Sequence, residues 1–233
     1  MINTVLHGDC LQLMKDIPDK SIDMILCDLP YGTTACKWDT IIPFEPLWEQ
    51  YKRIIKDNGA IVLTASQPFT SALVMSNPKM FKYDLVWTKS EGTGFYNANR
   101  MPLRAHEDIL VFYKKLPDYN PQKTEGKPYT AKRGSASDVY VGKDLMVTEN
   151  TTGDRHPLSW KLFKKDKDKT HPTQKPVALF EYLIKTYTNE GDLVLDNCAG
   201  SGTTGVACKN TNRNYILIEK EQEYIDIINK RLA

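Results

Sequence analysis

The sequence predicts an α/β protein in which helices cover both faces of a mostly parallel sheet. The main observation is an alternation of short apolar runs with helical patterns, which fills residues 1–113 and resumes after residue 176. Strands that alternate with helices in this way are typical of βαβ units. The second observation is size, because 233 residues suffice for one core domain with a small inserted segment.

The expected elements follow one another in chain order. In the N-terminal part, apolar runs predict strands at Thr4–His7, Ile22–Cys27, Ala60–Thr64, Tyr83–Thr88 and Ile109–Tyr113. Helical periodicity lies between them at Cys10–Ile17, Phe44–Ile55 and Pro68–Ser76. In the C-terminal part we expect helices at 176–188, 203–210 and 221–231 and strands at 193–196 and 215–219. We therefore predict that 1–113 and 171–233 form one domain.

The segment 114–170 between these two parts lacks their periodicity. Eight Gly and Pro residues interrupt it, so we expect loops and short strands. It holds 13 Lys/Arg and 8 Asp/Glu, and this local positive excess suits contact with phosphates. Charge alone fits a solvated lysine-rich loop better. Because the segment interrupts a regular domain, we interpret it as an inserted target-recognition segment.

The tetrad Asp28-Leu29-Pro30-Tyr31 closes the second apolar strand. The Asp28 carboxylate and the Leu29 carbonyl are hydrogen-bond acceptors, Pro30 stiffens the turn, and Tyr31 offers a flat face for stacking. Two acceptors beside a stacking plane suit the exocyclic amino group of a nucleobase. Asp and Pro are also ordinary turn formers at a strand end, so the tetrad alone leaves both interpretations open.

A glycine-rich turn follows the strand at Leu193–Leu195 and precedes a helix. Gly200, Gly202 and Gly205 fit the pattern G-x-G-x-x-G, in which glycines let a ligand approach the backbone closely. The next strand ends in Glu219, whose carboxylate can accept hydrogen bonds from ribose hydroxyls. These features fit NAD and S-adenosylmethionine equally well.

Taken together, the motifs resemble those of the beta class of DNA amino-methyltransferases, which methylate adenine N6 or cytosine N4. The tetrad is similar to the D/N/S-P-P-Y/F motif of that family, with Leu29 in place of the usual proline. Further similar segments are His7-Gly8-Asp9-Cys10, Arg104-Ala105-His106-Glu107 and His171-Pro172-Thr173-Gln174-Lys175-Pro176. The order of the motifs, catalytic first and cofactor loop last, also resembles that class.

The resemblance implies a Rossmann-like methyltransferase fold that is circularly permuted and uses S-adenosylmethionine. It implies that Asp28, Leu29, Pro30 and Tyr31 are catalytic. The expected cofactor-binding residues are Asp9, Cys10, Asp28, Thr173, Lys175, Asp196, Asn197, Cys198, Ala199, Gly200, Ser201, Gly202, Thr203 and Glu219. Double-stranded DNA is the expected partner, and the resemblance is compatible with a homodimer. Such enzymes occur in restriction–modification systems, so we expect a cytoplasmic protein that is encoded by a bacterium or a phage and associates with the nucleoid when it acts.

Aspartate at position 28 favours adenine over cytosine, because cytosine-N4 enzymes of this type more often have serine there. Cytosine N4 remains the alternative within the same chemistry. A cofactor-binding DNA-recognition module without catalysis and a nicotinamide oxidoreductase are alternatives of other classes. A C5-cytosine enzyme needs a cysteine nucleophile, and Cys27 lies in an apolar strand without the Pro-Cys context of that family.

Two loops near predicted strand ends each have two interpretations. Residues 32–39 follow the tetrad and are interpreted as a mobile loop that closes over substrate, whereas Trp38 fits a core role as well. Residues 91–97 form a glycine- and aromatic-rich loop. It suits the base pocket or a DNA groove, and a purely structural loop is an equal alternative.

Composition argues against several other classes. No apolar run approaches the length of a membrane span, and no basic and apolar leader is expected at the N-terminus. The five cysteines lack C-x-x-C spacing, which argues against a disulfide framework and for a reducing compartment. The four histidines are scattered, so we expect no metal site.

Overall fold

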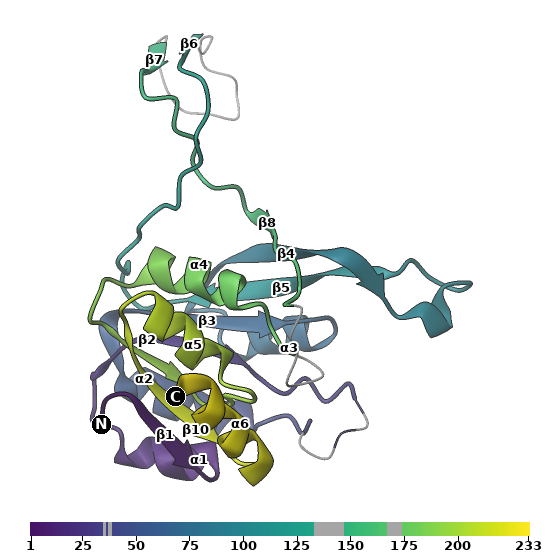
Figure 1. Cartoon of the computed structure of the whole chain (residues 1–233), viewed down its shortest axis with the longest axis vertical. Helices are drawn as coiled ribbons and strands as arrows, with labels where there is room; N and C mark the ends of the chain where they lie inside the picture. The colour runs from purple at the N-terminus through teal and green to yellow at the C-terminus, as the bar shows by residue number, and fades with distance from the viewer. Residues whose placement is uncertain (35, 37–38, 133–146, 167–173) are drawn as a thin grey trace. The chain divides into compact units, whose positions relative to one another are not determined.

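The computed structural model describes residues 1–34, 36, 39–132, 147–166 and 174–233 (Figure 1). The chain divides into two compact units. The larger combines Met1–Asn120 with Ser159–Ala233, and the smaller is Pro121–Leu158. The compact insert is thus shorter at both ends than the segment 114–170, which lacks helix or strand periodicity in the sequence.

A mixed sheet forms the centre of the larger unit. In the described residues it has eight strands, in the order β1 (Thr4–His7), β10 (Asn214–Glu219), β9 (Leu193–Asp196), β2 (Ile22–Asp28), β3 (Ile55–Ala65), β5 (Arg104–Phe112), β4 (Phe81–Thr93) and β8 (Trp160–Leu162). The strands from β1 to β3 are all parallel. Strand β5 is antiparallel to both β3 and β4. The predicted α/β class with a mostly parallel sheet is confirmed.

Helices cover both faces of this sheet (Figure 1). One face carries α1 (Cys10–Leu13), α2 (Phe44–Ile54) and α3 (Phe69–Ser76), and the other carries α4 (Val177–Tyr187), α5 (Thr203–Asn210) and α6 (Gln222–Leu232). Side chains along β2 alternate between the two cores: Ile25 and Cys27 join the first, and Met24 and Leu26 the second. Because β2 is buried on both faces, its sequence is apolar throughout.

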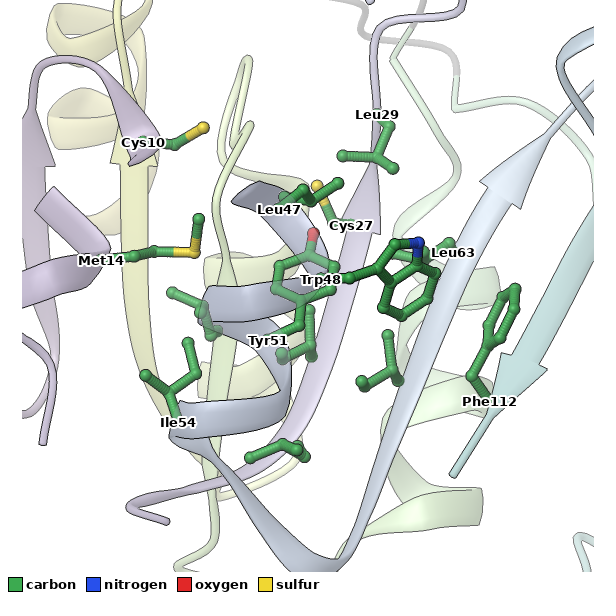
Figure 2. Close-up of a cluster of buried hydrophobic side chains, with 14 of the residues drawn as sticks. Cys10, Met14, Cys27, Leu29, Leu47, Trp48, Tyr51, Ile54, Leu63 and Phe112 are labelled. Carbon is green, nitrogen blue, oxygen red and sulfur yellow. The ribbon is translucent and has the colours of Figure 1, made fainter. Parts of the chain in front are cut away.

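The first core connects α2 to the residues that follow β9. Figure 2 shows the rings of Trp48 and Tyr51 lying against β2 and β3. Trp48 packs on Phe112 with ring centroids 5.0 Å apart. The Tyr51 side chain is buried, and its hydroxyl donates to Oδ1 of Asn197 at 2.5 Å. The core therefore fixes the first residues after β9.

The structure differs from the predicted elements mainly in β3, which begins at Ile55 and not at Ala60, and in β4 and β5. Strands β4 and β5 extend well past the apolar runs that predicted them, and a short 3₁₀ turn, η2 (Phe95–Asn97), joins them. The extra residues are mostly polar, so hydrophobic periodicity gave no signal for them. The helix expected at Cys10–Ile17 ends at Leu13 and continues as the 3₁₀ turn η1 (Met14–Asp16).

The smaller unit, Pro121–Leu158, contains a two-stranded antiparallel sheet of β6 (Tyr129–Lys132) and β7 (Val147–Asn150). The Arg155 guanidinium lies over the Tyr129 ring, 4.6 Å from its centroid. By sequence this unit has six Lys/Arg and five Asp/Glu, so it is nearly neutral. The basic excess of 114–170 lies mostly in 159–170, which has five Lys and two Asp.

Among the described residues, none of the helices combines the length and the apolar character that crossing a membrane requires.

Candidate active site

The two sequence motifs end neighbouring parallel strands. In the register of β2 with β9, Ile25 pairs with Leu195, so Asp28 and Asp196 leave the sheet at the same edge. The chain leads from β2 to β3 on one side and from β9 to β10 on the other. In open α/β sheets, ligands bind at the carboxyl ends of strands where the strand order reverses in this way.

A cavity of about 600 Å³ lies at this edge of the sheet. It is lined by every predicted site residue that the structure describes except Gly202: Asp9, Cys10, Asp28, Leu29, Pro30, Tyr31, Lys175, Asp196, Asn197, Cys198, Ala199, Gly200, Ser201, Thr203 and Glu219. Thr173 lies outside the described residues. One cavity therefore joins the tetrad to the glycine loop, although the motifs are far apart in sequence.

Hydrogen bonds to two carboxylates hold the glycine loop in shape. Asp196 accepts from the backbone N–H of Cys198 at 3.1 Å and from the hydroxyl of Thr204. Burial raises the pKa of Asp196 to about 6. The N–H of Gly200 donates to Oε2 of Glu219 at 2.7 Å, which joins the loop to the end of β10.

Backbone donors occupy most of the acceptor positions of the Glu219 carboxylate. Besides Gly200, the backbone N–H groups of Lys220 and Glu221 donate to its Oε1 at 2.7 and 2.9 Å. A carboxylate offers about four acceptor positions, so one remains for a ligand hydroxyl. Burial raises the pKa of Glu219, but those three donors favour the charged form.

The glycines of the loop have different functions. Gly202 begins α5 with φ of 78°, and a Cβ there would meet Cγ1 of Ile228 at 3.0 Å. A Cβ at Gly205 would meet Leu217 at 2.8 Å. Gly202 and Gly205 thus permit close packing of α5 on α6 and β10. Neither lines the cavity, so a direct cofactor contact through Gly202 finds no support in the geometry.

The carboxylate of Asp28 has three protein partners. Nζ of Lys175 donates to Oδ2 at 2.6 Å, the Tyr31 hydroxyl donates to Oδ1 at 2.8 Å, and the Thr64 hydroxyl also donates to Oδ1. Three of about four acceptor positions are used, which leaves one directed away from these donors. The sequence identified Asp28 and Tyr31 but not Thr64, whose position on the neighbouring strand β3 gives no local signal.

Lys175 also belongs to a longer chain of alternating charges. Its ammonium lies 3.2 Å from Oε2 of Glu107, and Oε1 of Glu107 lies 2.5 Å from Nζ of Lys89. Only 7% of the Lys175 side chain and 6% of the Lys89 side chain are exposed. Burial opposes charge on Lys175, but Asp28 and Glu107 outweigh it and raise its pKa. Burial likewise opposes charge on Glu107, and the two lysines outweigh it and lower its pKa.

Aromatic packing fixes the ring of Tyr31. It stacks on Phe69 with ring centroids 5.2 Å apart and an interplanar angle of 26°. Burial, followed by the nearby charge of Asp28, raises the pKa of Tyr31, so its hydroxyl stays protonated and remains a donor. The side chain of Leu29 is 3% exposed and belongs to the first core. Leucine therefore anchors the turn by packing where the related motif has a rigid proline.

The loop after the tetrad is organised by a residue that the sequence did not single out. Asp39 accepts from the backbone N–H groups of Gly32, Thr33 and Thr34 at 2.8, 2.9 and 2.7 Å. Burial opposes its charge, but these donors lower the pKa of Asp39. Thr33, Thr34 and Asp39 line the cavity. Trp38 lies outside the described residues.

Cys27 is not suited to act as a nucleophile. Its side chain is fully buried, and burial raises the pKa of the thiol to about 12. Among the described residues there is also no group of three or more His, Cys, Asp or Glu side chains that could hold a metal ion.

Comparison with known proteins identifies the family. A family model described as DNA methylase matches residues 22–230. The chain belongs to the DNA methylase family. The Type II methyltransferase M.HinfI of Haemophilus influenzae is 30% identical over 99% of this chain and 68% of its own length. For M.HpaI of Haemophilus parainfluenzae, the identity is 29% over 100% of this chain and 74% of its own length.

Solved structures agree with this assignment. The crystal structure of the M1.HpyAVI–SAM complex aligns with a TM-score of 0.70 and 29% identity, covering 98% of this chain and 99% of that one. The cytosine-N4-specific PvuII DNA methyltransferase aligns with a TM-score of 0.74 over 100% of this chain and 87% of its own. Its identity is 16%, so that likeness shows the fold alone. The predicted methyltransferase fold, the predicted DNA methyltransferase activity and the predicted cofactor, S-adenosylmethionine, are confirmed.

The residues of the cavity fit that cofactor. The Glu219 carboxylate keeps an acceptor position for ribose hydroxyls, and the left-handed turn at Gly200 (φ 51°) brings backbone to the cavity wall. The Asp28 carboxylate lines the same cavity, which favours a cationic ligand.

Proposed function

We propose that this DNA methyltransferase methylates the N6 amino group of an adenine that is flipped out of double-stranded DNA. The observation that carries the proposal is the single cavity lined by both Asp28 and the Gly200 turn. A base inside a duplex cannot bring its amino group into such a cavity, so the target must leave the stack.

Asp28 and the backbone carbonyl of Leu29 act as the two acceptors for the amino hydrogens. The amino lone pair of adenine is delocalised into the ring, and two such hydrogen bonds favour a more pyramidal, more nucleophilic nitrogen. Lys175, Tyr31 and Thr64 hold the Asp28 carboxylate in one orientation. The remaining acceptor position of Asp28 is therefore oriented before the amine binds. Such preorganisation is a major source of rate enhancement in enzymes.

Tyr31 provides a wall for the flipped base. Its ring is fixed by Phe69 on one side and by the hydroxyl contact with Asp28. An aromatic ring that is held in place loses little entropy when a base stacks on it, and such stacking contributes roughly 1–3 kcal/mol.

The cofactor would be held by the glycine loop, by Glu219 at the ribose and by the Asp9–Cys10 segment at the start of α1. When bound, S-adenosylmethionine supplies an electrophilic methyl group on a sulfonium. The protein aligns the amine, excludes water and holds the Asp28 carboxylate in one orientation. The proton of the methylated amine leaves to Asp28 or to water, and no covalent enzyme intermediate is needed.

The preference for adenine rests on aspartate at position 28, as the sequence comparison of motifs suggested. The family includes enzymes for both bases, so the identity of the base needs a direct test. Genomic DNA from cells that express the protein should be digested and its nucleosides analysed by mass spectrometry. N6-methyladenine supports the proposal, and N4-methylcytosine would overturn the choice of base.

The compact unit Pro121–Leu158 is proposed to recognise the target sequence, together with the basic stretch 159–170. The unit is a separate compact insert between Met1–Asn120 and Ser159–Ala233. Its near neutrality implies that it reads bases or shape, while the five lysines of 159–170 contact phosphates.

A further inference from the structure

The hairpin of β4 and β5 ends in an exposed apolar tip that the methyl-transfer site does not use. In Figure 1 the two strands extend past the end of β3 to the turn η2. At this tip Phe95 is 71% exposed, Tyr96 104% and Met101 58%. Clustered large apolar side chains in water mark an interaction surface. We refer to Phe95, Tyr96 and Met101 as the hairpin tip.

Backbone hydrogen bonds fix the shape of the hairpin tip. Gly94 adopts φ of 93°, and the N–H of Asn97 donates to its carbonyl at 2.9 Å. The N–H of Met101 donates to the carbonyl of Asn97 at 3.0 Å. Below the turn, a Cβ at Gly92 would meet Cβ of Leu103 at 2.7 Å, so glycine there lets the strands close tightly. The two aromatic rings are therefore presented on an ordered turn.

The stem of the same hairpin lines the catalytic cavity. Lys89 and Thr93 from β4 and Arg104 and Glu107 from β5 all contribute to its wall. Thr93 precedes Phe95 by two residues, which at about 3.3 Å per residue places the tip roughly 7 Å along the chain from the cavity wall. The hairpin tip thus continues directly from a part of the hairpin that forms the cavity wall.

We propose that Phe95 and Tyr96 contact the base stack of duplex DNA next to the target and stabilise the duplex after the target base has left. The inference rests on the proposed function, because only a flipped base requires the duplex to lie against the cavity. Apolar wedges that insert between base steps are an established way to unstack DNA. Exposed Arg100 and Arg104 on the same hairpin supply positive charge for the flanking phosphates.

A second copy of the chain suits the hairpin tip less well. A stable protein interface buries about 800 Å² on each partner. Two aromatic side chains and a methionine on a narrow turn supply roughly half to three-quarters of that area, since a buried aromatic covers about 150–250 Å². The flanking residues Asn97, Asn99 and Arg100 are hydrogen-bond donors, which suit nucleic acid.

The test compares two DNA duplexes. The target sequence is first read from the methylated positions in DNA of expressing cells. One duplex carries that site fully paired, and the other carries a mismatch opposite the target base, which lowers the cost of flipping. The variant is the double substitution Phe95→Ala/Tyr96→Ala. The matched control is Met75→Ala, because Met75 is 72% exposed but lies on α3 and does not line the cavity.

The double variant should methylate the paired duplex about tenfold more slowly or worse, which corresponds to the loss of one stacking contact. On the mismatched duplex its rate should return to within about threefold of the unsubstituted protein. The fluorescence of 2-aminopurine at the target position should rise with the unsubstituted protein and with Met75→Ala, and stay low with the double variant. Cofactor affinity should not change.

Three results would overturn the inference: an unchanged rate on the paired duplex, an equal loss on both duplexes, or a change from dimer to monomer in sedimentation that accompanies the loss. The last would assign the hairpin tip to self-association. If the DNA of expressing cells carries no N6-methyladenine, the proposed function itself fails before either duplex is made. The two failures are therefore distinguishable.

Discussion

The ammonium of Lys175 lies 2.6 Å from Oδ2 of Asp28, although 147 positions separate the two residues in the chain. The contact joins a motif expected on the cofactor side to the catalytic tetrad. Because Lys175 also contacts Glu107 at 3.2 Å, it connects carboxylates from two different strands. Methyl transfer should therefore depend on Lys175, which holds the catalytic carboxylate of Asp28 in position.

Replacing Lys175 by methionine should lower kcat by about tenfold to hundredfold near neutral pH, because a hydrogen bond to a charged group contributes roughly 1.5–3 kcal/mol. Without the ammonium, Glu107 loses one of the two cations that lower its pKa, so its pKa should rise and the activity of the variant should rise with pH. Lys175→Arg retains the charge and should recover part of the rate. The measurement is single-turnover methylation between pH 5.5 and 9.

Lys56→Met is the matched control for that experiment. Lys56, on β3, forms a 2.6 Å ion pair with Asp23, which lies on β2 as Asp28 does. This pair lies outside the cavity. The Lys56→Met substitution should leave the pH profile of methylation unchanged. A Lys175→Met protein that is less stable but has the pH profile of the unsubstituted protein would contradict the positioning role and leave Lys175 a structural residue.

Asp28→Ala should abolish most methyl transfer while leaving cofactor affinity within a fewfold. The substitution removes the acceptor at the reacting nitrogen, and the loss of one preorganised polar group of this kind costs about 10²–10³ in kcat. Asp23→Ala, on the same strand, serves as a control for general damage to β2. Calorimetric titration with S-adenosylmethionine and single-turnover rates separate the two effects. A loss of cofactor binding equal to the loss in rate would contradict the assignment.

Tyr31→Phe should show whether the hydroxyl or the ring matters more. Phenylalanine retains the stacking on Phe69 but loses the hydrogen bond to Asp28, so kcat should fall about tenfold with KM for DNA unchanged. Tyr31→Ala loses both and should also raise KM. If phenylalanine proves fully active, Thr64 and Lys175 alone suffice to orient Asp28.

Much of the fold follows from local patterns. The bounds of β1, β9 and α5 agree with the sequence prediction, because each is an apolar or helical run with a clear turn at its end. The meeting of the tetrad and the glycine loop was also predictable in outline. Parallel strands bring their carboxyl ends to one edge, whatever their separation in the chain.

Other parts of the site depend on packing that no local pattern encodes. The chain from Lys89 through Glu107 to Lys175 joins three separate segments, and a lysine in a polar loop looks the same whether it is buried or solvated. Gly202 matched a ligand-binding fingerprint, but its lack of a side chain serves the contact with Ile228. Asp39 gave no signal because its partners are backbone N–H groups.

Replacing the unit Pro121–Leu158 by a short Gly-Ser linker should separate recognition from catalysis. The unit is compact by itself, so the remaining domain should still bind S-adenosylmethionine and unfold cooperatively. Sequence-specific methylation should be lost. The measurements are calorimetric titration with the cofactor and sequencing of methylated positions. A shortened protein that still methylates the original site would show that recognition resides elsewhere, with 159–170 and the hairpin tip as the remaining candidates.

Asp196 should make the protein less stable as pH rises from about 4 to about 6. Burial raises its pKa to about 6 from the ordinary 3.8, so the folded state holds this proton more tightly than the unfolded state does. Folding therefore gains stability from a protonated Asp196 at low pH, and the gain disappears as pH passes through the folded-state pKa. A shift of about two units corresponds to roughly 3 kcal/mol.

Carboxylates with lowered pKa values, such as Glu107 and Asp39, change stability in the opposite direction over the same range. The effect of Asp196 must therefore be read as a difference between the unsubstituted protein and Asp196→Asn. The amide disturbs the hydrogen bond from Cys198 equally at all pH values, which gives a constant offset. Urea unfolding from pH 4 to pH 7 should show the stability of the unsubstituted protein falling relative to that of the variant. A constant difference across this range would mean that Asp196 is already ionised at pH 4 and that its hydrogen bonds outweigh burial.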